Sequence, residues 1–200
     1  DWIEEIEPQF KRMITQPEKL TDIDAIIATG SDNTARYFEY YFGKYPGIIR
    51  KNRTSIAVLN GFETEQELIE LGKDVFDYFG LGCRNVSKIM IPRSFDIKLL
   101  LSLWEKYGEI IYHNKYRNNY DYHKSILLVN KVNHLDTGFA LFTESSDLVS
   151  PTSVIYYQYY SNKKDLLIYL SEQSDKIQCI ISNESVPKKV AFGKAQRPEP

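Results

Sequence analysis

The chain has 200 residues, enough for one large domain or two small ones, and 42% of them are hydrophobic, which is ample for a core. Its formal net charge of −2 gives no overall attraction to nucleic acid, so we expect no nucleic-acid partner. Two cysteines far apart in the sequence make no disulfide framework, and neither a membrane-spanning run nor a secretory signal is found. These features predict a cytoplasmic protein.

The first strong pattern is a strand, a turn and a helix. Residues 23–29 are apolar and β-branched, which is typical of a buried strand, and Gly30–Thr34 follows at once. Residues 35–42 then predict a helix. The exposed amide groups at such a helix start favour a bound phosphate. An ordinary connection capped by Ser31 or Asp32 explains the same residues equally well.

A second unit of the same kind begins after a polar loop. Residues 55–59 predict another buried strand. Thr64 and Glu67 form a capping box that opens a helix, predicted to run to Phe79. Residues 88–91, with the apolar run Ile89–Ile91, predict the next strand. A short connection joins the helix to this strand.

Cys83 lies on that connection. Gly80 and Gly82 allow unusual backbone angles and leave little side-chain bulk beside the sulfur. Arg84 follows directly, and a nearby positive charge lowers a thiol's pKa and favours the nucleophilic thiolate. Two interpretations stay open: Cys83 is a nucleophile, or it is a small buried hydrophobe. Cys179, inside an apolar strand pattern, is expected in the core.

Strands and helices continue to alternate to the end of the chain, which predicts an α/β fold with a largely parallel sheet. The best domain break lies near residues 52–56. The three histidines have no metal-ligand spacing with either cysteine, so no metal site is predicted. Further helices are expected over 95–107, from about 118 to 132 and from Asn162, and further strands over 138–143, 153–160 and 177–182.

Four short motifs occur in a consistent order. Residues 26–35 read Ile-Ile-Ala-Thr-Gly-Ser-Asp-Asn-Thr-Ala, Gly82-Cys83 follows a strand and a helix, and Ser150–Val154 and Val190–Lys194 come later. This order resembles the aldehyde dehydrogenase superfamily. The resemblance implies that the first motif packs on the diphosphate of a nicotinamide cofactor, that Cys83 is the catalytic cysteine, and that the last two are the family's Gly-Pro-Val and Phe-Gly motifs.

One departure from that family narrows the resemblance. Hydrolytic members carry a glutamate upstream of the cysteine to activate water, whereas residues 45–52 contain no acid. Without that base, release of the acyl group by water should be slow, while release by hydride or a thiol needs no such residue. The chain is therefore similar to the acyl-CoA reductase branch, the long-chain fatty-acid reductases of the bioluminescence type. In that branch a cysteine takes the acyl group of acyl-CoA as a thioester, and NADPH reduces it to the aldehyde.

The resemblance also implies a domain plan. Residues 1–54 would be the C-terminal part of a Rossmann-like cofactor domain, and residues 55–187 a three-layer catalytic domain. Residues 188–200 would be a truncated Phe-Gly segment. The chain would then be the C-terminal catalytic fragment of a longer homo-oligomeric enzyme, and the fragment alone is expected to reduce acyl-CoA poorly.

Site residues follow from the resemblance, residue by residue. Cys83 is expected to accept the acyl group, and NADPH is the expected cofactor, with NADH as the alternative. Two other functions stay open: an oxidising aldehyde dehydrogenase with an unidentified base, and a non-catalytic α/β module with an inert cysteine. The supporting residues are Gly82, Arg84 and Asn85, the cofactor-binding residues are Gly30, Ser31, Asp32 and Thr34, and the ribose-contacting acid is Glu144 or Asp147.

Overall fold

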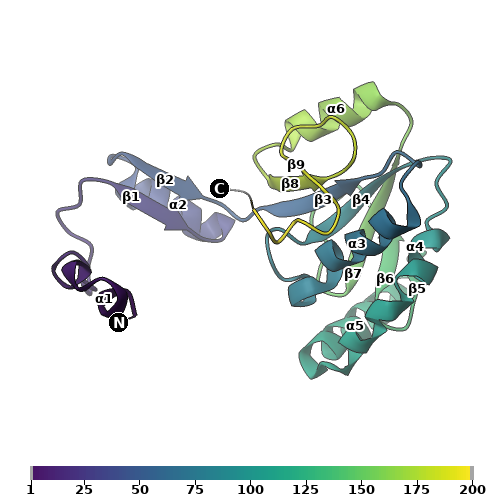
Figure 1. Ribbon diagram of the computed structural model, residues 1–200, viewed down its shortest axis with the longest axis horizontal. Coiled ribbons are helices and arrows are strands. Elements are labelled where there is room, and N and C mark those ends of the chain that lie inside the picture. Colours follow the sequence, from purple (N-terminus) through teal and green to yellow (C-terminus); the bar gives the residue numbers. More distant parts are fainter. Residues whose placement is uncertain (1, 199–200) are drawn as a thin grey trace. The chain divides into compact units, whose positions relative to one another are not determined.

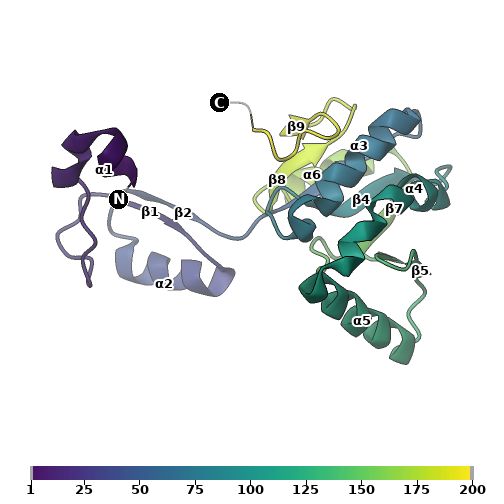
Figure 2. The same cartoon turned by 60° about the horizontal axis from the view of Figure 1, so that its bottom comes forward.

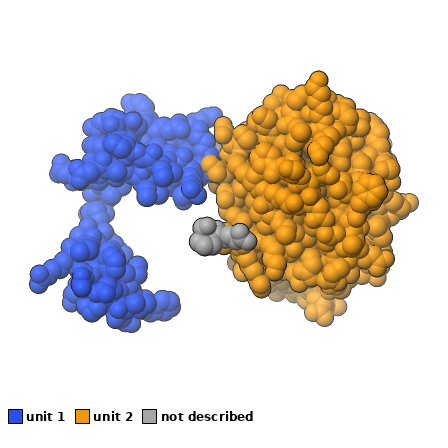
Figure 3. Space-filling model, turned by 45° about the horizontal axis from the view of Figure 1, so that its top comes forward, with its two compact units in different colours: residues 1–51 blue, residues 52–200 orange. Residues whose placement is uncertain are grey.

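The computed structural model describes residues 2–198, apart from the side chain of Asp32. The chain forms two compact units, residues 1–51 and residues 52–200 (Figure 3). The boundary falls close to the break expected near residues 52–56, while the roles of the two units stay predictions. No helix in the described part of the chain is long and apolar enough to cross a membrane.

The first unit is a two-stranded parallel sheet with one helix. Ile26 and Ala28 are buried on one face of the sheet, whereas Ile27 points to the other face and is 81% exposed. Strand β2 is not predicted by the sequence, because two isoleucines between glycine and arginine are too short a run to indicate a strand. The elements are α1 (Trp2–Ile6), the 3-10 helix η1 (Pro8–Arg12), β1 (Ile26–Thr29), α2 (Asp32–Phe42) and β2 (Gly47–Arg50).

The second unit alternates strands and helices along the chain. Its sheet has the order β5-β6-β7-β4-β3-β8-β9, and every pair is parallel except β5 with β6. This confirms the predicted α/β fold with a largely parallel sheet. The elements are β3 (Thr54–Val58), α3 (Glu65–Phe76), η2 (Asp77–Gly80), β4 (Val86–Pro92), α4 (Lys98–Leu103), η3 (Glu105–Tyr112), α5 (Asn114–Val129), β5 (Leu135–Asp136), β6 (Leu141–Glu144), β7 (Val154–Tyr160), α6 (Lys163–Glu172), β8 (Ile177–Ile181) and β9 (Lys189–Val190).

Helices cover both faces of this sheet and give it three layers (Figures 1 and 2). Helices α3 and α4 pack on one face, where the larger apolar cluster lies, and α6 packs on the other face against a smaller cluster. Side chains of β3 alternate between the two clusters: Ala57 joins the first, and Ile56 and Val58 join the second. Strand β3 is therefore buried on both sides, as its continuous apolar run predicts.

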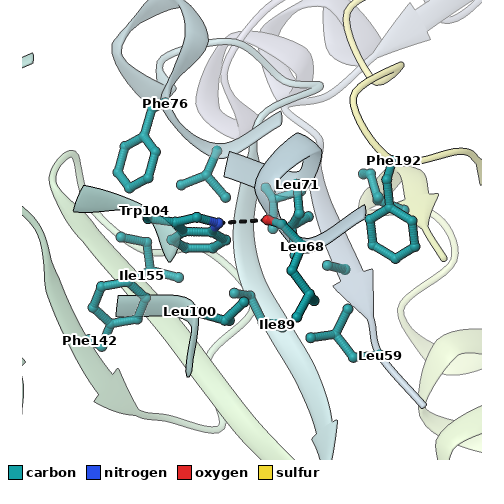
Figure 4. Close-up of a cluster of buried hydrophobic side chains, with 14 of the residues drawn as sticks. Leu59, Leu68, Leu71, Phe76, Ile89, Leu100, Trp104, Phe142, Ile155 and Phe192 are labelled. Carbon is teal, nitrogen blue, oxygen red and sulfur yellow. Dashed lines mark hydrogen bonds between the residues drawn. The ribbon is translucent and has the colours of Figure 1, made fainter. Parts of the chain in front are cut away.

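Trp104 joins the helical layer to the core. Its side chain is fully buried, and its indole N–H donates to the carbonyl oxygen of Leu68 at 2.7 Å (Figure 4). Trp104→Phe should leave that carbonyl without its partner and a cavity where the second ring was. We expect the free energy of unfolding to fall by about 2 kcal/mol in denaturant titrations. Tyr112→Phe, at an exposed tyrosine, is the control and should change it little.

Helix α3 begins as predicted but ends earlier. The capping box is present, since the amide of Glu67 donates to the hydroxyl of Thr64 and the amide of Thr64 donates to the carboxylate of Glu67. The helix was predicted to reach Phe79, but it ends at Phe76. Tyr78 and Phe79 take φ values of 54° and 61°, in the left-handed region that non-glycine residues rarely enter. The chain thus turns sharply before it reaches Cys83.

Other differences lie at element ends. The single helix predicted over 95–107 is divided into α4 and the 3-10 helix η3, which continues past Gly108. Helix α5 starts at Asn114 rather than near Asn118. Strands β5 and β9 have two residues each, and such short strands leave no periodic signal in a sequence.

Candidate active site

Cys83 lines a cavity at the amino-terminal edge of the sheet. Because β3, β4 and β7 are neighbouring parallel strands, the segments that lead into them meet at this edge. Cys83 is exposed, and the cavity has a volume of about 390 Å³. The structure therefore places the thiol where a ligand can reach it, and the alternative of a buried Cys83 is wrong. The lining comprises Asn52–Thr54, Gly80–Cys83, Asn85, Ser87 and Val149–Thr152.

Asn85 holds the turn that carries the cysteine. Its side chain is 2% exposed, and its Nδ2 donates to the carbonyl oxygens of Asp74 at 3.0 Å and Asp77 at 2.8 Å. Its Oδ1 accepts from the amide of Gly82 at 2.8 Å. A Cβ on Gly82 would lie 2.9 Å from that same Oδ1, so a side chain there would disturb the contact. Gly82 and Asn85 thus shape the turn that carries Cys83.

A serine links the two cysteines. The hydroxyl of Ser55 donates to the carbonyl oxygen of Cys83 at 3.0 Å and lies 3.1 Å from the sulfur of Cys179. The hydroxyl has one proton, so the thiol of Cys179 is the donor in the second contact. Burial raises the pKa of the Cys179 thiol, which keeps it protonated. Cys179 is 2% exposed, which confirms the prediction that it lies in the core.

Arg84 turns away from the cavity. Its Nε donates to the carbonyl oxygen of Ala195, and it is not among the residues that line the cavity with Cys83. We expected the charge of Arg84 to lie beside the sulfur of Cys83 because the two residues are adjacent in the sequence. The structure instead ties this guanidinium to the C-terminal segment.

Asp74 is a buried acid that sequence reasoning missed. Its carboxylate oxygens accept from the amides of Gly193 at 2.7 Å and Ala195 at 2.9 Å. Burial raises the pKa of Asp74 to about 6, against the two hydrogen bonds, and the charges of Asp77 and Glu70 add to the rise. Its position in a polar stretch of α3 gave no sign of burial. The acid therefore fixes the Phe-Gly segment to the end of α3.

This pKa predicts how stability depends on pH. A carboxyl whose pKa is higher in the folded protein than in the unfolded chain binds its proton more tightly when folded. Its contribution to the free energy of unfolding must therefore grow as the pH falls from about 7 towards 4. The rise from 3.8 to about 6 corresponds to about 3 kcal/mol.

The measurement is denaturant unfolding of the wild type and of Asp74→Asn between pH 7.5 and 4.5, values chosen to bracket this pKa of about 6. The unfolding free energy of the wild type minus that of Asp74→Asn should grow towards acid pH. A difference that stays constant or shrinks over this range would contradict the assignment. Asp175→Asn, which removes an exposed carboxyl group from the same protein, is the matched control.

The turn Gly30–Thr34 of the first unit connects β1 to α2. Ser31 caps the helix, accepting from the amide of Thr34 at 3.2 Å, and the two hydroxyls lie 2.9 Å apart. A Cβ on Gly30 would lie 2.7 Å from Cγ2 of Thr34, so the turn itself requires glycine. Asp32 begins α2, and its side chain lies outside the described part. The ordinary capped connection is thus present, and it leaves Ser31 and Thr34 exposed.

Comparison with family models and with curated protein sequences found no match. Solved structures do match. An indole-3-acetaldehyde dehydrogenase from P. syringae, in complex with NAD+ and IAA, has a TM-score of 0.61 and 9% identity, over 83% of this chain and 46% of that one. The fold is that of the aldehyde dehydrogenases. The aldehyde dehydrogenase KauB from Pseudomonas aeruginosa has a TM-score of 0.59 and 9% identity, over 82% of this chain and 45% of that one. The delta-pyrroline-5-carboxylate dehydrogenase from Mycobacterium tuberculosis bound with NAD has a TM-score of 0.57 and 17% identity, over 80% of this chain and 37% of that one.

The chain spans less than half the length of each of these aldehyde dehydrogenase structures. At identities of 9% to 17% the likeness shows the fold alone. In this aldehyde dehydrogenase fold, no three His, Cys, Asp or Glu side chains within residues 2–198 are grouped to hold a metal ion.

A buried lysine holds one wall of the Cys83 cavity, and the sequence did not suggest it. The Nζ of Lys88 donates to the carbonyl oxygen of Ser146 at 2.9 Å, to Oε1 of Gln158 at 2.6 Å and to the hydroxyl of Tyr169 at 3.2 Å. Burial lowers its pKa to about 8. Ser87, its neighbour, donates to the carbonyl oxygen of Leu148 at 3.0 Å. These bonds fix the loop that leads into Ser150–Val154.

The two candidates for a ribose-contacting acid lie differently. Glu144 is the last residue of β6, opposite Tyr157, and does not line the Cys83 cavity. Asp147 lies in the loop held by Lys88, two residues before the wall that starts at Val149. Its charge acts on Lys88 in the direction of a higher pKa. Of the two acids, Asp147 is thus nearer in the chain to the cavity wall.

Proposed function

We propose that this chain carries the acyl-accepting cysteine of an NADPH-dependent acyl-CoA reductase. The observation that carries the proposal is the cavity at Cys83. Its thiol is exposed, and among residues 2–198 the cavity lining contains no Asp, Glu or His. The lining that the structure describes therefore offers a thioester at Cys83 no base to activate water. An acyl group on Cys83 would therefore persist long enough for reduction to the aldehyde.

The first chemical step uses only this chain's own residues. The thiolate of Cys83 attacks the thioester carbonyl of acyl-CoA, and a new carbon–sulfur bond forms as the bond to the CoA sulfur breaks. CoA leaves as a thiol, with the proton that Cys83 gave up. The amide N–H of Cys83 is a candidate donor to the oxyanion that develops. The turn held by Asn85 keeps this N–H and the thiol in one fixed geometry.

The cofactor is proposed to bind at the turn Gly30–Thr34. Ser31 and Thr34 are exposed at the start of α2, a helix of 11 residues, so a diphosphate fits at this helix start. When bound, the nicotinamide supplies the hydride that reduces the acyl group. Asp32 would lie beside it, and Asp147 rather than Glu144 is favoured as the acid near the ribose.

The test is acyl transfer without cofactor. The protein is incubated with a long-chain acyl-CoA, and peptides are mapped by mass spectrometry. We expect one acyl adduct, on Cys83, that survives in water. In the longer enzyme that the resemblance implies, the adduct should be lost when NADPH is added. Steady hydrolysis of the adduct would support the alternative of an oxidising aldehyde dehydrogenase. The absence of an adduct would support a non-catalytic module with an inert cysteine.

A further inference from the structure

A second cavity, of about 200 Å³, is lined by four basic residues. Arg84 comes from the turn after Cys83, Lys189 from β9, and Lys194 and Arg197 from the C-terminal loop. The other lining residues are Val190, Ala191 and Pro198, so no acid contributes to the lining within residues 2–198. The whole chain has a net charge of −2, so this concentration of positive charge is local.

These charges have no acidic partner in the described structure. None of the four forms an ion pair within residues 2–198. The two acids whose charges act on this group are already engaged, since Glu70 pairs with Lys73 at 2.6 Å and Glu184 pairs with Lys163 at 2.5 Å. Like charges held around one cavity repel each other, and a bound anion removes that repulsion.

The loop that carries two of the cations is held in place. Asp74 accepts from the amides of Gly193 and Ala195, and Arg84 donates to the carbonyl oxygen of Ala195. Ala195 is fully buried. Lys194 lies between two anchored residues, while its own side chain and that of Arg197 are exposed. The backbone that carries Lys194 and the guanidinium of Arg84 are therefore in place before any ligand arrives, which lowers the cost of binding.

We propose that this cavity binds the phosphate groups of coenzyme A. This proposal rests on the proposed function, in which acyl-CoA is the substrate. The CoA moiety carries a diphosphate and a 3′-phosphate, whose negative charges match four cations, and arginine and lysine are the side chains that bind phosphate. Arg84 and Cys83 are consecutive residues of one turn, and each lines a different cavity. The uncharged, flexible pantetheine arm would connect the phosphates to the thioester at Cys83.

Direct binding tests the site without any chemistry. CoA is titrated by calorimetry into the wild type, into Lys194→Gln/Arg197→Gln, and into the control Lys164→Gln/Lys176→Gln, which removes the same charge from exposed lysines elsewhere. The Kd for CoA should rise about tenfold or more in the first variant only, and the wild-type Kd should rise with salt. Unchanged affinity in the first variant, with an unchanged thermal unfolding curve, would overturn the proposal.

The choice of probe distinguishes three sources of phosphate. 3′,5′-ADP represents CoA, 2′,5′-ADP represents NADPH, and inorganic phosphate represents a simple anion. The proposal expects the variant to lose affinity for 3′,5′-ADP. A loss confined to 2′,5′-ADP, or to inorganic phosphate, would overturn it in favour of a cofactor site or a site for a free anion.

Acylation of Cys83 distinguishes this proposal from the proposed function. An acyl-pantetheine donor has no phosphates, so Lys194→Gln/Arg197→Gln should acylate from it at the wild-type rate and from acyl-CoA about tenfold more slowly at low donor concentration. Equal slowing with both donors would contradict a phosphate site. If neither donor acylates the wild type, the proposed function fails, while the loss of CoA binding in the variant would still support the cavity as a CoA site.

Discussion

Replacing Cys83 with alanine should abolish acyl transfer from acyl-CoA. The change removes the atom that forms the covalent bond, so the rate should fall by a factor of about 10⁴ or more, although acyl-CoA still binds. Folding should be unaffected, because Cys83 is exposed and the bond from Ser55 reaches its carbonyl oxygen rather than its side chain. The measurement is the rate of adduct formation by mass spectrometry, with CoA binding by calorimetry to show that the site is intact.

Cys179 provides the matched control for this prediction. Cys179→Ala removes a buried thiol that donates to Ser55, so it should cost about 1 kcal/mol of stability and leave the acylation rate unchanged. Alkylation at neutral pH should label Cys83 first, since Cys179 is buried and its raised pKa keeps it protonated. A fully active Cys83→Ala protein, or label that appears first on Cys179, would rule out the proposed mechanism.

The second large effect is expected at Asn85. Asn85→Ala would leave the carbonyl oxygens of Asp74 and Asp77 and the amide of Gly82 without partners, all close to the end of α3. We expect the free energy of unfolding to fall by about 3 kcal/mol, because stranding buried polar groups costs far more than the net value of the bonds. The released turn should also change the rate at which Cys83 reacts with a small alkylating reagent.

Two further variants sharpen the test at Asn85. Asn85→Asp keeps the acceptor for Gly82 but cannot donate to the two carbonyls, so it should be at least as unstable as the alanine variant. Asn119→Ala, which removes a side-chain bond to the carbonyl of Lys115 on α5, should cost less than about 1 kcal/mol. Equal stability of Asn85→Ala and Asn119→Ala would show that the turn does not depend on Asn85.

The features that could be predicted from the sequence are those set by local patterns. The alternation of strands and helices gave the largely parallel sheet, and Thr64 with Glu67 marked the start of α3 because a capping box needs only four consecutive residues. The glycines before Cys83 indicated a turn with an accessible thiol, and the structure has one. In each case the signal and its cause lie within a few residues of each other.

The features that were missed depend on residues far apart in the chain. Asp74 reads as one more polar residue of a helix, and only the folded chain shows that its carboxylate accepts from residues 193 and 195. Lys88 reads as a break in an apolar strand, but its ammonium finds three acceptors on β7, α6 and the loop after β6. The charge of Arg84 was expected near the sulfur of Cys83 only because the two residues are adjacent, whereas its partner is the carbonyl oxygen of Ala195. No pattern within one segment contains these partners.

The bond between Ser55 and Cys179 also has a consequence for folding kinetics. The two residues are 124 positions apart, and they lie on the paired strands β3 and β8. This part of the sheet therefore forms only when β8, near the end of the chain, pairs with β3. Contacts over such long separations form slowly. Shielding of the Cys179 thiol should thus be a late event in refolding. Pulsed alkylation during refolding would detect it as the phase in which Cys179 loses its reactivity while Cys83 keeps its own.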